Sequence, residues 1–241
     1  MHSLLARLRL ALGPVLVVAL LAACAPEPVT TEGEQVKFLY DVFLVAAAVV
    51  FVVVAGLIGW SIVRHRDTGD GAEGIGPHEN VRLELLWWAI PTVLVIVLFI
   101  LTAQVLGVVD ERTDDPELTV TVTGFQWQWQ FAYEGSDVVL SGLPDEPPLV
   151  VLPVGRRIAF DLESPDVIHS FWVPRFLIKR DVVPGRTNRM ELTIEEEGTY
   201  AGLCGEFCGL LHHRMRFSIE AVGPEEFDAW LASQSGPEGD Q

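Results

Sequence analysis

Two long uncharged stretches in the first half of the chain limit its possible folds more than any other feature. Residues 42–63 and 85–109 contain no Asp, Glu, Lys or Arg, and about 20 apolar residues suffice for a helix to cross the hydrocarbon core of a bilayer. The whole chain combines a mean hydropathy of +0.35 with a formal net charge of −17, which indicates separate apolar and acidic segments. We predict transmembrane helices over residues 38–63 and 85–109.

The charges that flank these stretches predict their orientation. Arg64, Arg66 and Arg82 lie in or beside the intervening loop, residues 64–84. The outer flanks carry acidic residues instead: Asp41, Asp110, Glu111, Asp114 and Asp115. Because loops rich in Lys and Arg stay on the cytoplasmic side, we expect 64–84 in the cytoplasm and the rest of the chain after residue 109 outside it.

The first 37 residues are typical of a secreted precursor. Arg7 and Arg9 precede an uncharged apolar run, residues 10–23, which predicts a signal peptide over 1–23. The tetrapeptide ending at Cys24 resembles the lipobox of bacterial lipoproteins, which implies cleavage before Cys24 and a lipid on its sulfur. The alternative is an ordinary signal beside an unmodified cysteine. Residues 24–37 are polar and contain Pro, so we expect a tether.

A period of two replaces the long apolar runs after residue 110. Apolar and polar residues alternate over 118–123, 157–162, 189–194 and 215–222, and Gly and Pro separate these segments. Short alternating strands with such turns predict an all-β sandwich or barrel. We therefore expect a membrane-anchored all-β protein with an extracytoplasmic domain over 110–232, a short terminal helix over 224–231 and a disordered tail over 233–241.

Four potential metal ligands cluster in one segment, Cys204-x3-Cys208-x3-His212-x2-Met215. Thiolate and thioether are soft ligands that suit copper, whereas a four-ligand zinc site has little use for Met. His169 is the best candidate for a further ligand, since His213 adjoins His212 and could share its metal only in a strained geometry. The alternative is a disulfide between the two cysteines, which an extracytoplasmic location permits.

At this point the chain resembles subunit II of the haem-copper cytochrome c oxidases over nearly its whole mature length. The matching segments occur in the family's order: Glu84-x2-Trp87-x3-Pro91, Gly124-x-Gln126-Trp127-x-Trp129, Asp166-x2-His169, Lys179-x-Asp181-x2-Pro184-Gly185-Arg186 and Cys204-x-Glu206-x-Cys208-x3-His212-x2-Met215. The resemblance implies a two-helix transmembrane hairpin followed by a cupredoxin-like domain.

The resemblance also implies a binuclear copper centre, CuA. Its ligands would be two bridging thiolates, two imidazoles, a thioether and a backbone carbonyl, from Cys204, Cys208, His169, His212, Met215 and Glu206 respectively. The Glu206 carboxylate would face subunit I and share a Mg²⁺ with it, because a carboxylate oxygen suits this hard cation. The alternative is that Glu206 is a solvated loop acid.

Several further roles follow from the resemblance. Trp127 matches the tryptophan that receives electrons from cytochrome c; the alternative of a core indole suits Trp129 better. Asp166 matches a docking acid for cytochrome c. Glu84 matches the entrance of the family's K proton pathway, although an acid at a helix N-terminus is also favoured by the helix dipole. Asp181 matches a residue near the Mg²⁺ and the proton exit.

The resemblance implies subunit II of an aa3-type oxidase, a proton-translocating enzyme of the bacterial plasma membrane. Electrons would pass from cytochrome c through this multi-pass chain to the haem of subunit I, where O₂ is reduced; the chain itself has no O₂-reducing site. Expected partners are subunits I and III, cytochrome c and membrane lipid, with no nucleic acid. The alternative is a CuA subunit of another terminal reductase, such as a nitric oxide reductase. The intact ligands disfavour a copper-free quinol-oxidase subunit, and the second span disfavours a copper-delivery lipoprotein.

Overall fold

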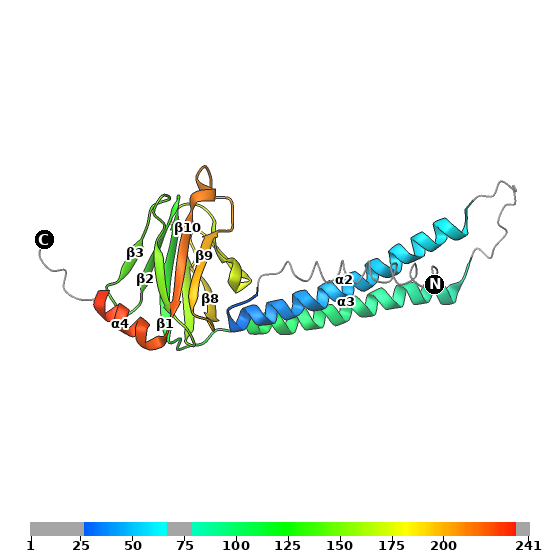
Figure 1. Ribbon diagram of the computed structural model, residues 1–241, viewed down its shortest axis with the longest axis horizontal. Coiled ribbons are helices and arrows are strands. Elements are labelled where there is room, and N and C mark those ends of the chain that lie inside the picture. Colours follow the sequence, from blue (N-terminus) through cyan, green and yellow to red (C-terminus); the bar gives the residue numbers. More distant parts are fainter. Residues whose placement is uncertain (1–26, 67–78, 235–241) are drawn as a thin grey trace, which may run out of the picture. The chain divides into compact units, whose positions relative to one another are not determined.

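The computed structural model describes residues 27–66 and 79–234 (Figure 1). The chain divides into two compact units, of which one contains Phe38–Gln104 and the other joins Pro26–Lys37 to Val105–Gln241. The predicted signal peptide, Cys24 and most of the predicted cytoplasmic loop lie outside the described residues.

The helical unit consists of two long helices, α2 (Thr31–Arg64) and α3 (Val81–Val109). The first residues of α2 and the last residues of α3 belong to the other unit. Each is long and apolar enough to cross a membrane. Both begin at a side-chain cap, since the Thr30 hydroxyl accepts a hydrogen bond from the Gly33 N–H and the Asn80 carboxamide accepts one from the Leu83 N–H. Such caps satisfy backbone donors that the first helical turn leaves free.

The expectation of a tether over residues 24–37 is wrong from Val29 onward. Val29 and Thr30 are buried, and Thr30 forms an antiparallel β-bridge with Ile194. Helix α2 begins at the next residue, and its first turn buries Glu32. Glu32 is buried because it pairs with Arg157 of the β unit, whereas Thr31 and Glu34 of the same segment are exposed.

Within the described residues, ten strands form two five-stranded sheets that pack face to face. The first sheet has the order β3-β2-β1-β5-β8, with the bounds β1 (Leu118–Phe125), β2 (Gln128–Tyr133), β3 (Val139–Ser141), β5 (Arg157–Glu163) and β8 (Asn188–Thr193). The second has the order β4-β10-β9-β6-β7, with the bounds β4 (Leu149–Pro153), β6 (His169–Val173), β7 (Ile178–Val182), β9 (Gly198–Cys204) and β10 (Arg216–Val222). Only the pairs β1–β5 and β4–β10 are parallel.

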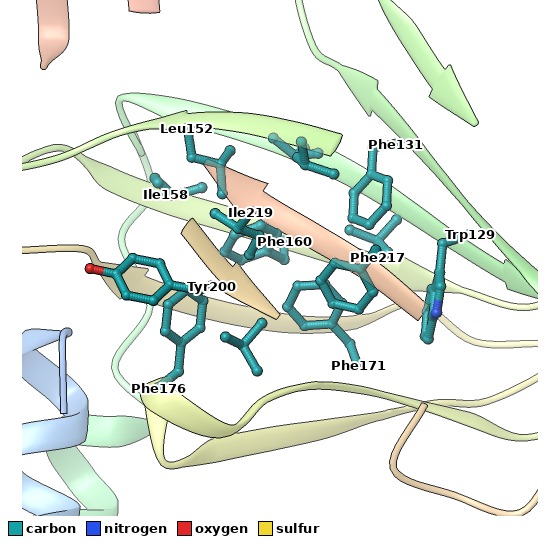
Figure 2. Close-up of a cluster of buried hydrophobic side chains, with 14 of the residues drawn as sticks. Trp129, Phe131, Leu152, Ile158, Phe160, Phe171, Phe176, Tyr200, Phe217 and Ile219 are labelled. Carbon is teal, nitrogen blue, oxygen red and sulfur yellow. The ribbon is translucent and has the colours of Figure 1, made fainter. Parts of the chain in front are cut away.

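Aromatic side chains fill the space between the sheets (Figure 2). Phe171 of β6 and Phe217 of β10 stack with ring centroids 4.9 Å apart, and Trp129 of β2 meets both edge-on. A Cβ at Gly202 would lie 2.1 Å from the Phe217 ring, so this strand position has room only for glycine. Tight packing of this kind holds β6, β9 and β10 in a fixed arrangement.

The chain closes the β unit with a short helix, α4 (Pro224–Gln234). Phe227 and Trp230 of this helix pack on Tyr133 of β2, as the expected terminal helix requires. Ser233 and Gln234 continue the helix, so the predicted disordered tail does not include them; the residues after 234 lie outside the described part. Two apolar helices followed by a β-sandwich confirm the predicted fold class.

Candidate metal centre

The predicted ligands meet where two neighbouring strands of the second sheet end. His169 is the first residue of β6 and Cys204 the last residue of β9. These strands are antiparallel, and Phe171 pairs with Cys204. Residues 35 positions apart in the chain are therefore brought together by strand register. The loop after Cys204 returns through the short 3-10 helix η2 (His212–Arg214) to Met215, which precedes β10.

Five contacts at short range connect the donor atoms of this cluster. Cys204 Sγ lies 3.9 Å from His169 Nδ1, 3.9 Å from Cys208 Sγ and 3.2 Å from the Glu206 carbonyl oxygen. Cys208 Sγ lies 3.6 Å from His212 Nδ1 and 3.8 Å from Met215 Sδ. Both cysteines are free, so the disulfide interpretation is wrong for this structure.

Most of the ligand side chains are shielded from water, and that of His212 is partly buried. His169 and Met215 are fully buried, and Cys204 and Cys208 expose 3% and 5% of their surfaces. Trp129 lies beneath them, with its ring centroid 6.2 Å from that of His169 and its indole N–H directed at the Met215 carbonyl at 3.5 Å. Two thiols, two imidazoles, a thioether and a carbonyl fit copper, because the thioether has no place in a closed four-ligand zinc site.

The two thiols differ in their pKa values. Burial raises the pKa of the Cys204 thiol, but contacts with His169 and with the backbone of Glu206 and Ser170 outweigh it and bring the pKa to about 7. Burial and the neighbouring Cys204 raise the pKa of Cys208 to about 12. Burial opposes protonation of His169, yet Cys204 and Asp166 raise its pKa. Of the two thiols, Cys204 is therefore the one that loses its proton more readily.

Asp166 contacts a ligand directly, which the sequence analysis did not foresee. Its Oδ1 lies 2.9 Å from His169 Nε2, and its carboxylate accepts hydrogen bonds from the backbone N–H groups of Gln126 and Val167 at 2.7 and 2.6 Å. Burial raises the Asp166 pKa, but these hydrogen bonds outweigh it and lower the pKa. Asp166 thereby fixes the orientation of the imidazole. The spacing of three residues between them was the only signal in the sequence.

The turn between β1 and β2 contacts the cysteine loop. The Trp127 indole N–H donates to the Cys208 carbonyl at 3.2 Å, and the Gln126 side-chain amide donates to the same oxygen at 2.7 Å. Trp127 is half-buried, whereas Trp129, the better candidate for a core indole, is fully buried. Sequence reasoning did not identify Gln126 as part of the site.

Charged side chains gather beside the cysteine loop. Lys179 Nζ lies 3.6 Å from an Asp181 oxygen and 3.9 Å from a Glu206 oxygen, and all three side chains are about half exposed. The structure thus brings Glu206 and Asp181 to one edge of the site. Glu84 lies in the first turn of α3, in the helical unit.

Comparisons with known proteins identify the family of the chain. The family models described as "Cytochrome C oxidase subunit II, periplasmic domain" and "transmembrane domain" match residues 143–222 and 14–105. A probable cytochrome c oxidase subunit 2 of Nocardia farcinica is 34% identical over 86% of this chain and 72% of its own length. Its counterpart in Streptomyces avermitilis is 35% identical over 86% and 77%.

Among solved structures, the crystal structure of the periplasmic domain of subunit II of cytochrome oxidase (CoxB) of Bradyrhizobium japonicum is similar, with 30% identity and a TM-score of 0.47. The match covers 51% of this chain and 96% of that one. Three observations indicate the same family: the identity to relatives over most of their length, the matches of both family models, and the cluster of His169 with two cysteines. The chain is a membrane-anchored subunit with a copper domain, in an oxidoreductase complex that includes subunit I. It belongs to the cytochrome c oxidase subunit II family.

Proposed function

We propose that the β unit holds a binuclear CuA centre and that the chain is the electron-receiving subunit of an aa3-type cytochrome c oxidase. The observation that carries this proposal is the convergence of two thiols, two imidazoles and a thioether in one cluster, in which His212 is partly buried and the other four side chains are buried. When bound, the copper pair would accept one electron at a time from cytochrome c and deliver it to the haem of subunit I.

The chain supplies the ligands and keeps them in place. Cys204, Cys208, His169 and His212 would hold the copper, with Met215 and the Glu206 carbonyl as further, weaker ligands. Strands β6, β9 and β10 hold the first and last members of this set, and the aromatic core behind them leaves little freedom to move. Small ligand displacements lower the barrier to electron transfer, and the buried setting keeps water away from the thiolates.

The surface around the cysteine loop suits a soluble cytochrome. Phe207 and Leu210 expose 77% and 81% of their surfaces on this loop, and Trp127 lies one hydrogen bond from the backbone of Cys208. We assign Trp127 as the residue that receives the electron and Asp166 as a docking acid as well as the partner of His169. The net negative charge of the chain favours a basic cytochrome c through electrostatic steering.

The oxygen-rich edge of the site suits a second cation. We assign a Mg²⁺ shared with subunit I to the Glu206 carboxylate, with Asp181 nearby, because carboxylate oxygens are the ligands that this hard cation prefers. Lys179 provides the positive charge there in the isolated chain. Glu84, in the first turn of α3, is assigned to the entrance of the proton pathway.

The remaining assignments concern the membrane. We assign a signal peptide to 1–23, a lipid to Cys24, a cytoplasmic location to 64–84 and an extracytoplasmic location to 110–232, in the bacterial plasma membrane. The apolar helices and the arginines beside the loop support this orientation. Subunit III is a further expected partner.

Copper reconstitution of the full-length protein in detergent tests the proposal. The expected result is two copper ions per chain and a mixed-valence two-copper signal in the EPR spectrum. A copper-free protein, or one with a single-copper signal, would overturn it. O₂ uptake with reduced cytochrome c by the complex that co-purifies with this chain tests the oxidase assignment, and consumption of nitric oxide instead would favour the alternative reductase.

A further inference from the structure

The turn between β1 and β2 is the third segment of the site, although it supplies no ligand. Its first residue, Gln126, forms hydrogen bonds with both segments that supply ligands. One is the loop that follows Cys204, and the other is the segment from Ser164 to His169. Strands β6 and β9, which bear these segments, are also joined by the contact of Cys204 with His169 and by the bond from the Gly205 N–H to the Ser170 carbonyl.

The side chain of Gln126 forms the first connection. Its amide Nε2 donates to the Cys208 carbonyl at 2.7 Å, beside the longer 3.2 Å bond from the Trp127 indole. A carbonyl oxygen has two lone pairs, so these two donors satisfy it. The next residue is Gly209 with φ of +119°, and a Cβ there would lie 3.1 Å from Gln126 Nε2 and 3.3 Å from Trp127 Nε1. Glycine thus permits this close approach.

The backbone of Gln126 forms the second connection. Its N–H donates to Asp166 Oδ2 at 2.7 Å, and Asp166 Oδ1 lies 2.9 Å from His169 Nε2. Gln126 is therefore bound directly to Cys208 and through one carboxylate to His169. Although Gln126 is an exposed residue, its amide contact with Cys208 is partly buried.

We infer that Gln126 is a positioning residue, which holds the Trp127 indole against the Cys208 carbonyl and so sets the rate at which an electron from a docked cytochrome c reaches the site. This inference rests on the copper function proposed above. In the step concerned, one electron leaves the reduced cytochrome c and reduces the copper pair, and no bond or proton changes place. Because electron transfer slows steeply with separation, a loosened indole slows the step without weakening docking.

Gln126→Met tests the inference, since Met has a similar length and no amide, while the backbone N–H remains for Asp166. In the full-length copper-free protein in detergent, exchange of the Trp127 indole proton with solvent, followed by NMR on ¹⁵N-tryptophan-labelled protein, should become about fivefold faster, the factor expected for one net hydrogen bond. In the copper-loaded oxidase, kcat with reduced cytochrome c should fall, with KM and the EPR signal unchanged.

Gln128→Met is the matched control, two residues along the same segment. Within the described residues no hydrogen bond joins the Gln128 side chain to either ligand-bearing segment, so exchange, kcat and KM should equal those of the wild type. Wild-type indole exchange in Gln126→Met, or a rise in KM at constant kcat in both variants, would overturn the inference. A wild-type protein without the two-copper signal would overturn the proposed function instead, and the exchange experiment would still decide whether Gln126 holds Trp127.

Discussion

Two polar clusters in the β unit differ in whether a side chain of the protein supplies their cation. In the ligand cluster, sulfur and nitrogen donors face one another at 3.6–3.9 Å, and the described part of the chain places no cation among them. In the second cluster, the Arg157 guanidinium is itself the centre. It pairs with Glu32, lies 3.4 Å from Glu191 and donates to the Glu111 carbonyl at 3.0 Å.

The carboxylates of the second cluster also have backbone partners. Glu32 accepts a hydrogen bond from the Thr193 N–H at 3.0 Å, and Glu191 accepts one from the Thr113 N–H at 2.9 Å. The chain itself therefore supplies the cation of the Arg157 cluster, although one buried Glu191 oxygen has no hydrogen-bond partner and lies 3.8 Å from Arg189 Nε. The cluster joins the segments beside both long helices to the sandwich. The ligand cluster is complete only with metal. We infer that the Arg157 cluster stabilises the fold, whereas the ligand cluster serves to bind metal.

The largest effect that would sharpen this comparison is the loss of a bridging thiol. Cys204→Ser should abolish the two-copper EPR signal, because a hydroxyl is a poor substitute for a soft thiolate. Thermal unfolding of the metal-free protein at or below pH 7 should change little, since the two side chains have similar shapes and Cys204 is then mostly protonated or only half ionised. A mixed-valence signal that survives in Cys204→Ser would remove Cys204 from the bridge.

Removal of Arg157 should have the opposite pattern. Arg157→Met leaves the buried carboxylate of Glu32 without its cation and leaves Glu191 with Arg189 alone, at 3.8 Å, which should lower the free energy of unfolding by about 4 kcal/mol. Denaturant titration of the metal-free protein measures this change, and the copper signal of the folded fraction should persist.

Arg156→Met is the matched control for this change. Arg156 is adjacent in sequence, and its Nη2 lies 2.7 Å from an oxygen of Asp228. The Asp228 side chain is 57% exposed. Exposed ion pairs contribute little to stability, so this variant should unfold almost as the wild type does. Equal losses in Arg156→Met and Arg157→Met would show that the Arg157 cluster has no special role.

The two clusters also differ in how far the sequence revealed them. Cys204, Cys208, His212 and Met215 lie close together in the chain, and their soft donors indicate copper before any fold is known. The Arg157–Glu32 pair joins residues 125 positions apart, and a polar segment such as 27–37 is equally typical of a tether. Local patterns predict elements and ligands, but a pairing that depends on how distant segments meet has no signature in a single sequence.

The same limit applies within the metal site itself. Alternation over residues 118–123 predicted β1, and His169 was identified because few other histidines were available. The contacts of Gln126 with Cys208 and Asp166 depend on three separate loops meeting at one end of the sandwich. Trp127 was named for its role, yet its hydrogen bond to Cys208 required the fold.

A smaller effect should follow from changing the carboxylate behind a ligand. Asp166→Asn removes the charge that faces His169 Nε2, and such changes typically weaken metal affinity about tenfold or more. Competition with a copper chelator measures the affinity. Asp137→Asn, on an exposed loop position, removes the same surface charge far from any ligand contact in the described structure and should leave the affinity unchanged. If Asp166 acts only as a docking charge, both variants will retain wild-type copper affinity.

The smallest expected effect is the ionisation of one thiol, that of Cys204, in the metal-free cluster. With a pKa of about 7 instead of the usual 9.0, Cys204 should form a thiolate whose absorbance at 240 nm appears with a midpoint near pH 7 in the wild type and is missing in Cys204→Ser. The native state then binds fewer protons than the unfolded state between pH 7 and 9, so the free energy of unfolding should rise with pH across this window. Above pH 9 the raised pKa of Cys208 reverses the slope, because the unfolded chain loses this proton first. A wild-type stability profile that is flat from pH 7 to 9, or identical to that of Cys204→Ser, would show that the cluster does not hold a thiolate before metal binds.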